Sequence, residues 1–123
     1  MKHAVIVVIT VLLFTSCELL HDDYKYDNVI IRSGSSKFGT IVYNIDGYYI
    51  RTGSSRFGSI AYNIDGDYIR AGSSRFGTIV YNFNRNYIRT GSNRSGTIAF
   101  NIDGDYIRSG SSIFGTIVYN IDR

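Results

Sequence analysis

Hydrophobic and polar positions alternate over short stretches of this chain, and residues 59–64 are representative. Ile60, Tyr62 and Ile64 occupy every second position there, which places their side chains on one face of a β-strand. Asp65 and Gly66 follow, a pair typical of a tight hairpin turn because glycine readily adopts positive φ. The pattern predicts a strand that ends in a tight turn and buries Ile60, Tyr62 and Ile64.

The residues after this turn predict the returning strand of a β-hairpin, over residues 67–70. Alternation places Tyr68 and Arg70 on one face of this strand and Ile69 on the other. A looser turn at residues 72–77 leads into the next strand. No window has helical period, so the sequence predicts an all-β fold built from hairpins.

The hairpin unit recurs every 19 residues from residue 28 to the end of the chain. A repeat of fixed period predicts stacked or ring-arranged units. An open solenoid and a closed ring would both bury the apolar faces, but a solenoid needs polar capping units, which neither end supplies. One arginine marks each copy: Arg32, Arg51, Arg70, Arg89 and Arg108.

The two ends of the repeat favour the ring. Residues 28–32 form half a hairpin, and residues 115–123 form the complementary half. Pairing these halves completes a fifth unit and removes the exposed strand edges of an open array. We therefore predict that residues 28–123 form five 19-residue β-hairpin repeats, closed into a pseudo-five-fold, propeller-like ring.

Two positions depart from the repeat. Arg85 stands where the other tight turns have glycine, and we expect Asn84 or Asn86 to take the left-handed conformation, which asparagine tolerates. Ser95 stands where the other copies have phenylalanine. If that position is buried, the lost apolar contact costs about 2 kcal/mol.

Residues 1–16 have the layout of a secretory signal peptide. Lys2 precedes an apolar stretch that is shorter than the roughly 20 residues of a membrane span. Cys17 is the only cysteine of the chain, so no intrachain disulfide is available to it. Residues 13–17, Leu-Phe-Thr-Ser-Cys, resemble the lipobox of bacterial lipoproteins, which implies that Cys17 is lipidated and anchors the protein in a membrane.

Residues 17–27 form a polar stretch with four acidic residues and one lysine, which predicts a solvated tether between the anchor and the repeats. Glu18 rather than aspartate follows the cysteine. By analogy with bacterial lipoproteins, this implies an exported protein in the outer membrane of a Gram-negative-type bacterium.

The lipobox and the five copies of D-G-x-Y-I-R-x-G-S-S-x-x-G-x-I-x-Y-N-I together resemble the five-fold β-flower family of small exported bacterial lipoproteins. The resemblance spans residues 28–123 and implies the closed ring predicted above. It brings no activity, cofactor or catalytic residue with it.

The residue types of the repeats argue against an enzyme. Residues 28–123 contain no histidine, cysteine or glutamate, and their six aspartates lie at or beside tight turns, where aspartate is favoured for backbone reasons. We therefore predict no catalytic residue, metal site or cofactor. Residues 28–123 carry eleven basic and six acidic residues, a mild excess that permits an anionic partner but does not indicate nucleic acid.

Tyrosine–arginine pairs on the outer face are the main candidate binding site. Such pairs can stack on sugars and hold hydroxyl, carboxylate or phosphate groups. In the alternative interpretation they form a packing ladder, in which each arginine stacks on a tyrosine and pairs with an Asp or Asn of the neighbouring copy. The pairs are Tyr49/Arg51, Tyr68/Arg70, Tyr87/Arg89 and Tyr106/Arg108. A second candidate is a basic rim on the looser turns, formed by Lys37, Arg56, Arg75 and Arg94.

Two functions follow as hypotheses. One is a non-enzymatic, lipid-anchored cell-envelope module that binds a glycan or an anionic surface ligand weakly through repeated sites, gaining avidity from repetition. The other is a structural or accessory protein that docks onto another envelope protein and binds no small ligand.

Overall fold

The computed structural model describes residues 29–122, which contain ten β-strands. Short strands of four or five residues alternate with longer strands of six residues. In chain order the strands are β1 (Val29–Ser33), β2 (Ile41–Asp46), β3 (Tyr49–Thr52), β4 (Ile60–Asp65), β5 (Tyr68–Ala71), β6 (Ile79–Asn84), β7 (Tyr87–Thr90), β8 (Ile98–Asp103), β9 (Tyr106–Ser109) and β10 (Ile117–Asp122).

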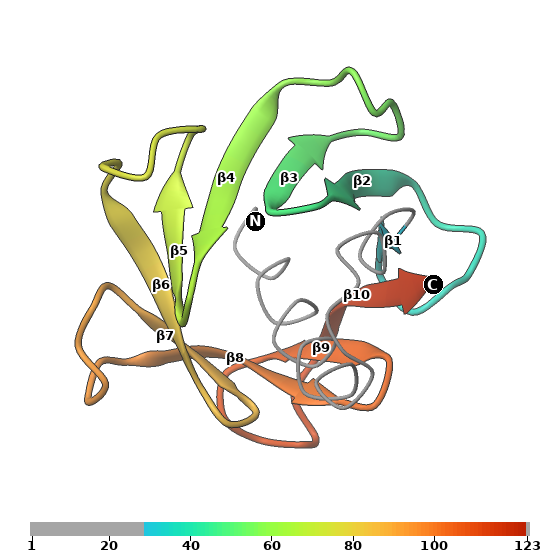
Figure 1. The fold of residues 1–123 in the computed structure, drawn as a ribbon. Helices are drawn as coiled ribbons and strands as arrows, with labels where there is room; N and C mark the ends of the chain where they lie inside the picture. Colours follow the sequence, from blue (N-terminus) through green and yellow to red (C-terminus); the bar gives the residue numbers. More distant parts are fainter. Residues whose placement is uncertain (1–28, 123) are drawn as a thin grey trace, which may run out of the picture.

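All ten strands belong to one closed antiparallel barrel (Figure 1). Each strand pairs with its neighbours in the sequence, and β1 pairs with β10 to complete the circle, with Ile31 opposite Ile121. The two ends of the repeat therefore meet as predicted, and the closed ring is confirmed over the open solenoid. Closure gives every described strand a partner on both sides.

The barrel interior is filled by residues at alternate strand positions. Each short strand contributes one isoleucine, such as Ile69, which is fully buried. Each long strand contributes an aromatic residue and the residue two positions on, such as Tyr62 and Ile64. The predicted core positions of Tyr62 and Ile64 are confirmed, and Ile69 shares the core with them. Burying one such side chain fully is worth about 1.5–3 kcal/mol, so the repeated layers supply the main drive for folding.

A β-bulge changes the prediction at Ile60, which is only half-buried. Ile50 pairs with Tyr62, whereas the next residue, Arg51, pairs with Ile60, so Ala61 is an extra residue in β4. The bulge breaks the strict alternation, because two residues of β4 oppose one position of β3. The expectation that Ile60 shares the core with Tyr62 is therefore wrong. The same register shift recurs at the other junctions of this kind.

The tight turns place their first residue at positive φ. Gly66 has a φ of 63°, whereas Asp67 has an ordinary negative value, as in a type II′ hairpin turn. Between β6 and β7, Arg85 itself has a φ of 64°, so the expectation that Asn84 or Asn86 takes this conformation is wrong. The reason is the register: Asn84 pairs with Tyr87, which makes Arg85 the first turn residue.

The looser loops that lead from short to long strands project outward around the barrel (Figure 1). In the loop after β3, the Thr52 N–H donates to the Ser59 carbonyl oxygen at 2.9 Å. A Cβ atom on Gly58 would lie 2.5 Å from the Thr52 carbonyl oxygen, so this position excludes a side chain. The close approach of the loop backbone to Thr52 therefore requires glycine at position 58.

Candidate functional site

The four predicted tyrosine–arginine pairs lie on the outer face of the barrel. Tyr68 is 36% exposed and Arg70 is half-buried, and both lie on β5. The other pairs occupy the same positions of β3, β7 and β9. The structure therefore distributes the pairs around the barrel, one to a short strand, and does not gather them into a single site.

Each arginine of these pairs has contacts within the protein. Arg70 donates from Nε to Asp65 Oδ2 at 3.0 Å and from Nη1 to the Gly77 carbonyl oxygen at 2.9 Å. The guanidinium carbons of the equivalent arginines lie 5.7–5.8 Å from the centroid of the paired tyrosine ring, within cation–π range: Arg51, Arg89 and Arg108. These contacts agree with the packing interpretation, except that Asp65 belongs to the same hairpin as Arg70. A ligand role for the pairs stays a prediction.

One buried asparagine on each long strand holds a loop against the barrel. Asn82 is 1% exposed, and its Nδ2 donates to the carbonyl oxygens of Gly91 at 2.7 Å and Asn93 at 3.1 Å. Only the nitrogen of the amide can donate to carbonyls, so these bonds fix its orientation. The equivalents are Asn44, Asn63, Asn101 and Asn120. Sequence reasoning missed them, although a polar residue that recurs at the centre of a strand was an available signal.

Open grooves lie on the outer face between neighbouring units. One groove has a volume of about 270 Å³ and is lined by residues 65–68 with Arg70, Asn82, Phe83 and Arg94. A second groove of about 270 Å³ is lined by Arg85, Asn86, Tyr87, Asn101, Ile102, Ser111 and Ile113. Most of the second set lies 19 residues after a member of the first, so the two grooves are equivalent sites of successive units.

The two grooves differ in charge. In the first groove, Arg94 Nη2 lies 3.3 Å from Asp67 Oδ2. In the second groove Asn86 and Ile113 occupy the equivalent positions. The features common to both grooves are a tyrosine ring and a buried asparagine, so a ligand that binds both must depend mainly on these.

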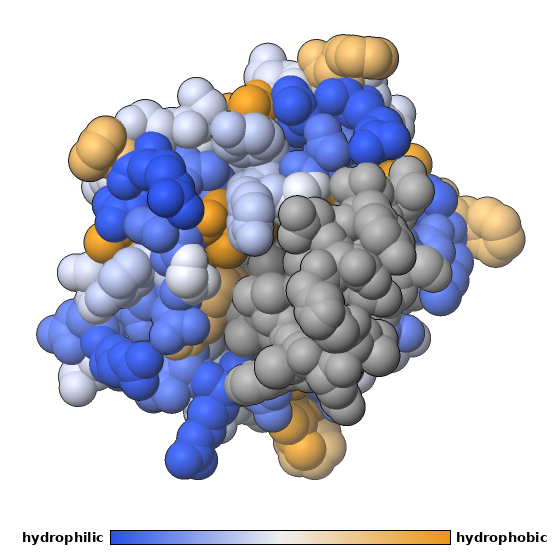
Figure 2. Space-filling model, in the orientation of Figure 1, coloured by the Kyte–Doolittle hydropathy of each residue, from blue (hydrophilic) through white to orange (hydrophobic). Residues whose placement is uncertain are grey.

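Phenylalanines at the loop tips are almost fully exposed, and hydrophobic side chains protrude at separate points around the molecule (Figure 2). Phe57 is 95% exposed, while its N–H donates to Ser55 Oγ at 3.0 Å. Ser95 replaces this phenylalanine in the loop after β7. The position is exposed, so the condition for a loss of apolar burial at Ser95 is not met. The other exposed rings are Phe38, Phe76 and Phe114.

The predicted basic rim lies in these same loops. Arg56 Nη2 is 3.2 Å from Asp46 Oδ1, and Arg75 Nη2 is 3.9 Å from Asp65 Oδ1. Lys37 is exposed in the loop after β1. The rim cations are therefore spread around the barrel, and the arginines form ion pairs with turn aspartates.

The remaining sequence predictions concern metals and the N-terminus. Within residues 29–122, no group of three or more His, Cys, Asp or Glu residues is placed to hold a metal ion. In the same range, no helix is long and apolar enough to cross a membrane. The predicted signal peptide (1–16), the lipidation site Cys17 and the tether (17–27) lie outside the described residues.

Comparison with known proteins agrees with the barrel. The family model described as 6-fold beta flower protein matches residues 21–123, which include every described strand. No curated protein and no solved structure matches the chain. The predicted resemblance to β-flower proteins is confirmed at this level, with six-fold rather than five-fold in the description of the family. The chain belongs to the 6-fold beta flower family.

Proposed function

We propose that this protein is a non-enzymatic binding module. It binds a saccharide, or an anionic ligand of the cell envelope, in grooves repeated around the barrel. The observation that carries the proposal is the recurrence of one groove, about 270 Å³ in volume, in two successive units. Each copy combines a tyrosine ring, which stacks on a sugar face, with polar side chains that bond to hydroxyl groups. Weak binding at each groove is strengthened when one polymer occupies several of them.

Arginines in both grooves also suit an acidic saccharide. Arg70 and Arg94 line the groove at Tyr68, where they pair with Asp65 and Asp67, and Arg85 lines the groove at Tyr87. Charge-assisted hydrogen bonds to a carboxylate or phosphate are about twice as strong as neutral ones. We expect an anionic ligand to prefer the groove at Tyr87, which Arg85 lines and no aspartate does, over the groove at Tyr68.

A glycan array followed by calorimetry tests this proposal. Tyr68→Ala and Tyr87→Ala are expected to weaken binding in steps, and the double variant to weaken it most. Thr90→Ala is the matched control, because Thr90 is exposed on a strand and lines neither groove. An array with no binding, or variants that bind as well as the parent protein, would contradict a groove function.

The exposed phenylalanines favour a second candidate, an accessory protein that docks onto another envelope protein. Phe38, Phe57 and Phe76 are 95–96% exposed, and buried aromatic anchors dominate the energetics of many protein interfaces. Crosslinking in cells that yields a single partner, lost in a Phe57→Ser/Phe76→Ser variant, would favour docking. A negative glycan array in the same study would reject the first candidate.

We propose further that the protein is an exported lipoprotein, anchored through Cys17 in the outer membrane of a Gram-negative-type bacterium. Support comes from the sequence of residues 1–27, where a signal-like segment precedes the lipobox-like stretch and the polar tether. Labelling with a radioactive or clickable fatty acid is expected to mark the parent chain and leave Cys17→Ala unmarked. A marked Cys17→Ala variant would refute the anchor.

We also propose that the ring of this chain counts five units, with loops radiating from it in a propeller-like manner. The 19-residue interval between its marker arginines and the two strands in each repeat support this count. Native mass spectrometry is expected to give the mass of one chain. A stable assembly in which a second chain contributes strands to the ring would contradict it.

A further inference from the structure

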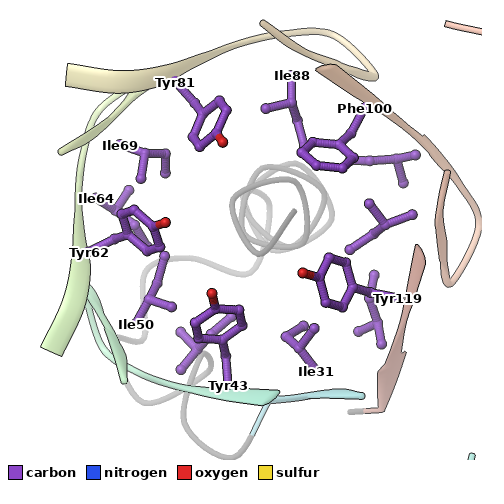
Figure 3. Close-up of a cluster of buried hydrophobic side chains, with 14 of the residues drawn as sticks. Ile31, Tyr43, Ile50, Tyr62, Ile64, Ile69, Tyr81, Ile88, Phe100 and Tyr119 are labelled. Carbon is purple, nitrogen blue, oxygen red and sulfur yellow. The ribbon is translucent and has the colours of Figure 1, made fainter. Parts of the chain in front are cut away.

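The aromatic residues of the long strands form a ring inside the barrel. They occupy equivalent positions on the five long strands, and all are buried: Tyr43, Tyr62, Tyr81, Phe100 and Tyr119. Figure 3 shows the hydroxyl groups of the four tyrosines pointing toward one another across the barrel axis. Neighbouring rings are close, with 6.4 Å between the centroids of Tyr43 and Tyr62 and 6.5 Å between those of Tyr81 and Phe100.

Two of these hydroxyls have no hydrogen-bond partner in the part of the chain that the structure describes. They belong to Tyr43 and Tyr119, each only 1% exposed. A buried O–H group without an acceptor costs about 1–3 kcal/mol, and native proteins rarely leave such groups unmatched. A Phe at both positions would pack the same ring without this cost, and the chain does carry Phe at the equivalent position 100.

The tyrosine hydroxyls of the ring are hydrogen-bond donors, and burial keeps them protonated. Burial raises the pKa of Tyr119 to about 12, with a contribution from the nearby Tyr62 phenol. Burial likewise raises the pKa of Tyr43, and the phenols of Tyr62 and Tyr119 add to this shift. At neutral pH each phenol therefore remains a neutral O–H group that can donate a hydrogen bond.

The surroundings favour a ligand that accepts hydrogen bonds. Among the described residues, the buried polar side chains are asparagines, and no carboxylate is buried in the barrel. Residues 28–123 carry eleven basic and six acidic side chains, so the whole domain has a positive potential. Several O–H donors converging on one point match a group with several acceptor atoms.

We propose that this tyrosine ring is a binding site for one small oxyanion on the barrel axis, held by hydrogen bonds from the hydroxyls of Tyr43 and Tyr119. The anion supplies acceptors at once to both hydroxyls that lack a partner among the described residues, and the flanking Tyr62 hydroxyl points to the same place. Phe100 leaves one side of the ring apolar. The site is separate from the outer grooves and stands independently of the function proposed for them.

Calorimetric titration of the full chain with sodium acetate and with inorganic phosphate tests the site, with sodium chloride at matched ionic strength as the blank. At least one of the two oxyanions is expected to bind the parent protein. The Tyr43→Phe/Tyr119→Phe variant keeps the rings and removes only the two donors. It is expected to bind about a hundredfold more weakly, because two hydrogen bonds to a charged group are lost and each is worth about a factor of ten or more.

Two further variants make the result specific. Phe100→Tyr adds a donor to the ring and is expected to bind the same anion more tightly, which tests the site even if the double variant folds poorly. Thr90→Ala alters an exposed residue that lines neither groove and does not belong to the ring, and is expected to leave oxyanion affinity unchanged. The proposal is overturned if neither anion binds, or if the double variant and Phe100→Tyr both titrate like the parent.

Discussion

Arg32 and Asp122 form an ion pair between β1 and β10, with 3.3 Å between Nη2 and Oδ2, and the two residues are 90 positions apart in the sequence. In three other hairpins the equivalent pair, such as Arg70 with Asp65, spans only five residues, whereas Asn84 replaces the aspartate in the hairpin of Arg89. The arginine–aspartate pair that is local within a hairpin elsewhere thus joins the two ends of the described chain here. Closure of the barrel depends on this non-covalent pairing of β1 with β10.

Removing residues 115–123 deletes β10, and the truncated protein is expected to unfold or to oligomerise, because β1 and β9 lose their partner strand. Circular dichroism and light scattering measure both outcomes. Asp122→Asn is the matched control: it removes one partly exposed ion pair, which is worth at most about 1 kcal/mol, and keeps the ladder. A truncated chain that remains a stable monomer would show that closure is dispensable.

Asn82→Ala removes the two hydrogen bonds that hold the loop after β7. We expect the free energy of unfolding in urea to fall by about 1–3 kcal/mol, because two carbonyl oxygens lose their donor beneath the loop. Asn86→Ala, at an exposed turn position, is expected to stay within about 0.5 kcal/mol of the parent. Equal effects of the two substitutions would mean that the buried amides do not fasten the loops.

Phe57→Ser copies the serine that the chain already has at position 95. The ring is 95% exposed, so the free energy of unfolding is expected to change by no more than about 0.5 kcal/mol. Phe83→Ala, in the core, is expected to cost about 3–5 kcal/mol. A large loss of stability for Phe57→Ser would indicate that the loop tips are covered in solution.

Arg85→Gly is expected to stabilise the protein by about 1 kcal/mol, because a non-glycine residue at a φ of 64° is strained. Gly66→Ala is the reciprocal test and is expected to destabilise by a similar amount. A Cβ at Gly66 meets no atom within 4 Å, so its effect isolates the backbone conformation. Urea denaturation that ranks these variants in the opposite order would contradict the assignment.

Alkaline pH is expected to destabilise the barrel through the buried phenols. The pKa of Tyr119 is about 12 in the folded protein and about 10 when unfolded. The unfolded chain therefore loses this proton first, and the stabilisation is complete below pH 10 and declines between pH 10 and 12. The decline is about 1.4 kcal/mol per pH unit for this group, and urea midpoints measured across that range are expected to fall. Tyr119→Phe is expected to make the free energy of unfolding depend less steeply on pH. An unchanged dependence would show that another group titrates in this range.

The periodicity of the sequence was sufficient to predict the hairpins and the closed ring. A strand needs only alternation and a turn needs only a residue that tolerates positive φ, so Tyr62, Ile64, Ile69 and Gly66 were assigned correctly from local pattern. The pairing of the two ends also followed, since two complementary half-hairpins leave edges that only each other can cover.

Ile60, Arg85 and Phe57 required the tertiary structure. The bulge at Ala61 depends on the register with β3, and the conformation of Arg85 depends on the pairing of Asn84 with Tyr87. Phe57 is apolar, yet it is exposed because Asn44 fixes its loop outside the barrel. Alternation specifies which residues share a face of one strand. Register between strands decides where that alternation breaks, and closure decides which side chains converge on the axis.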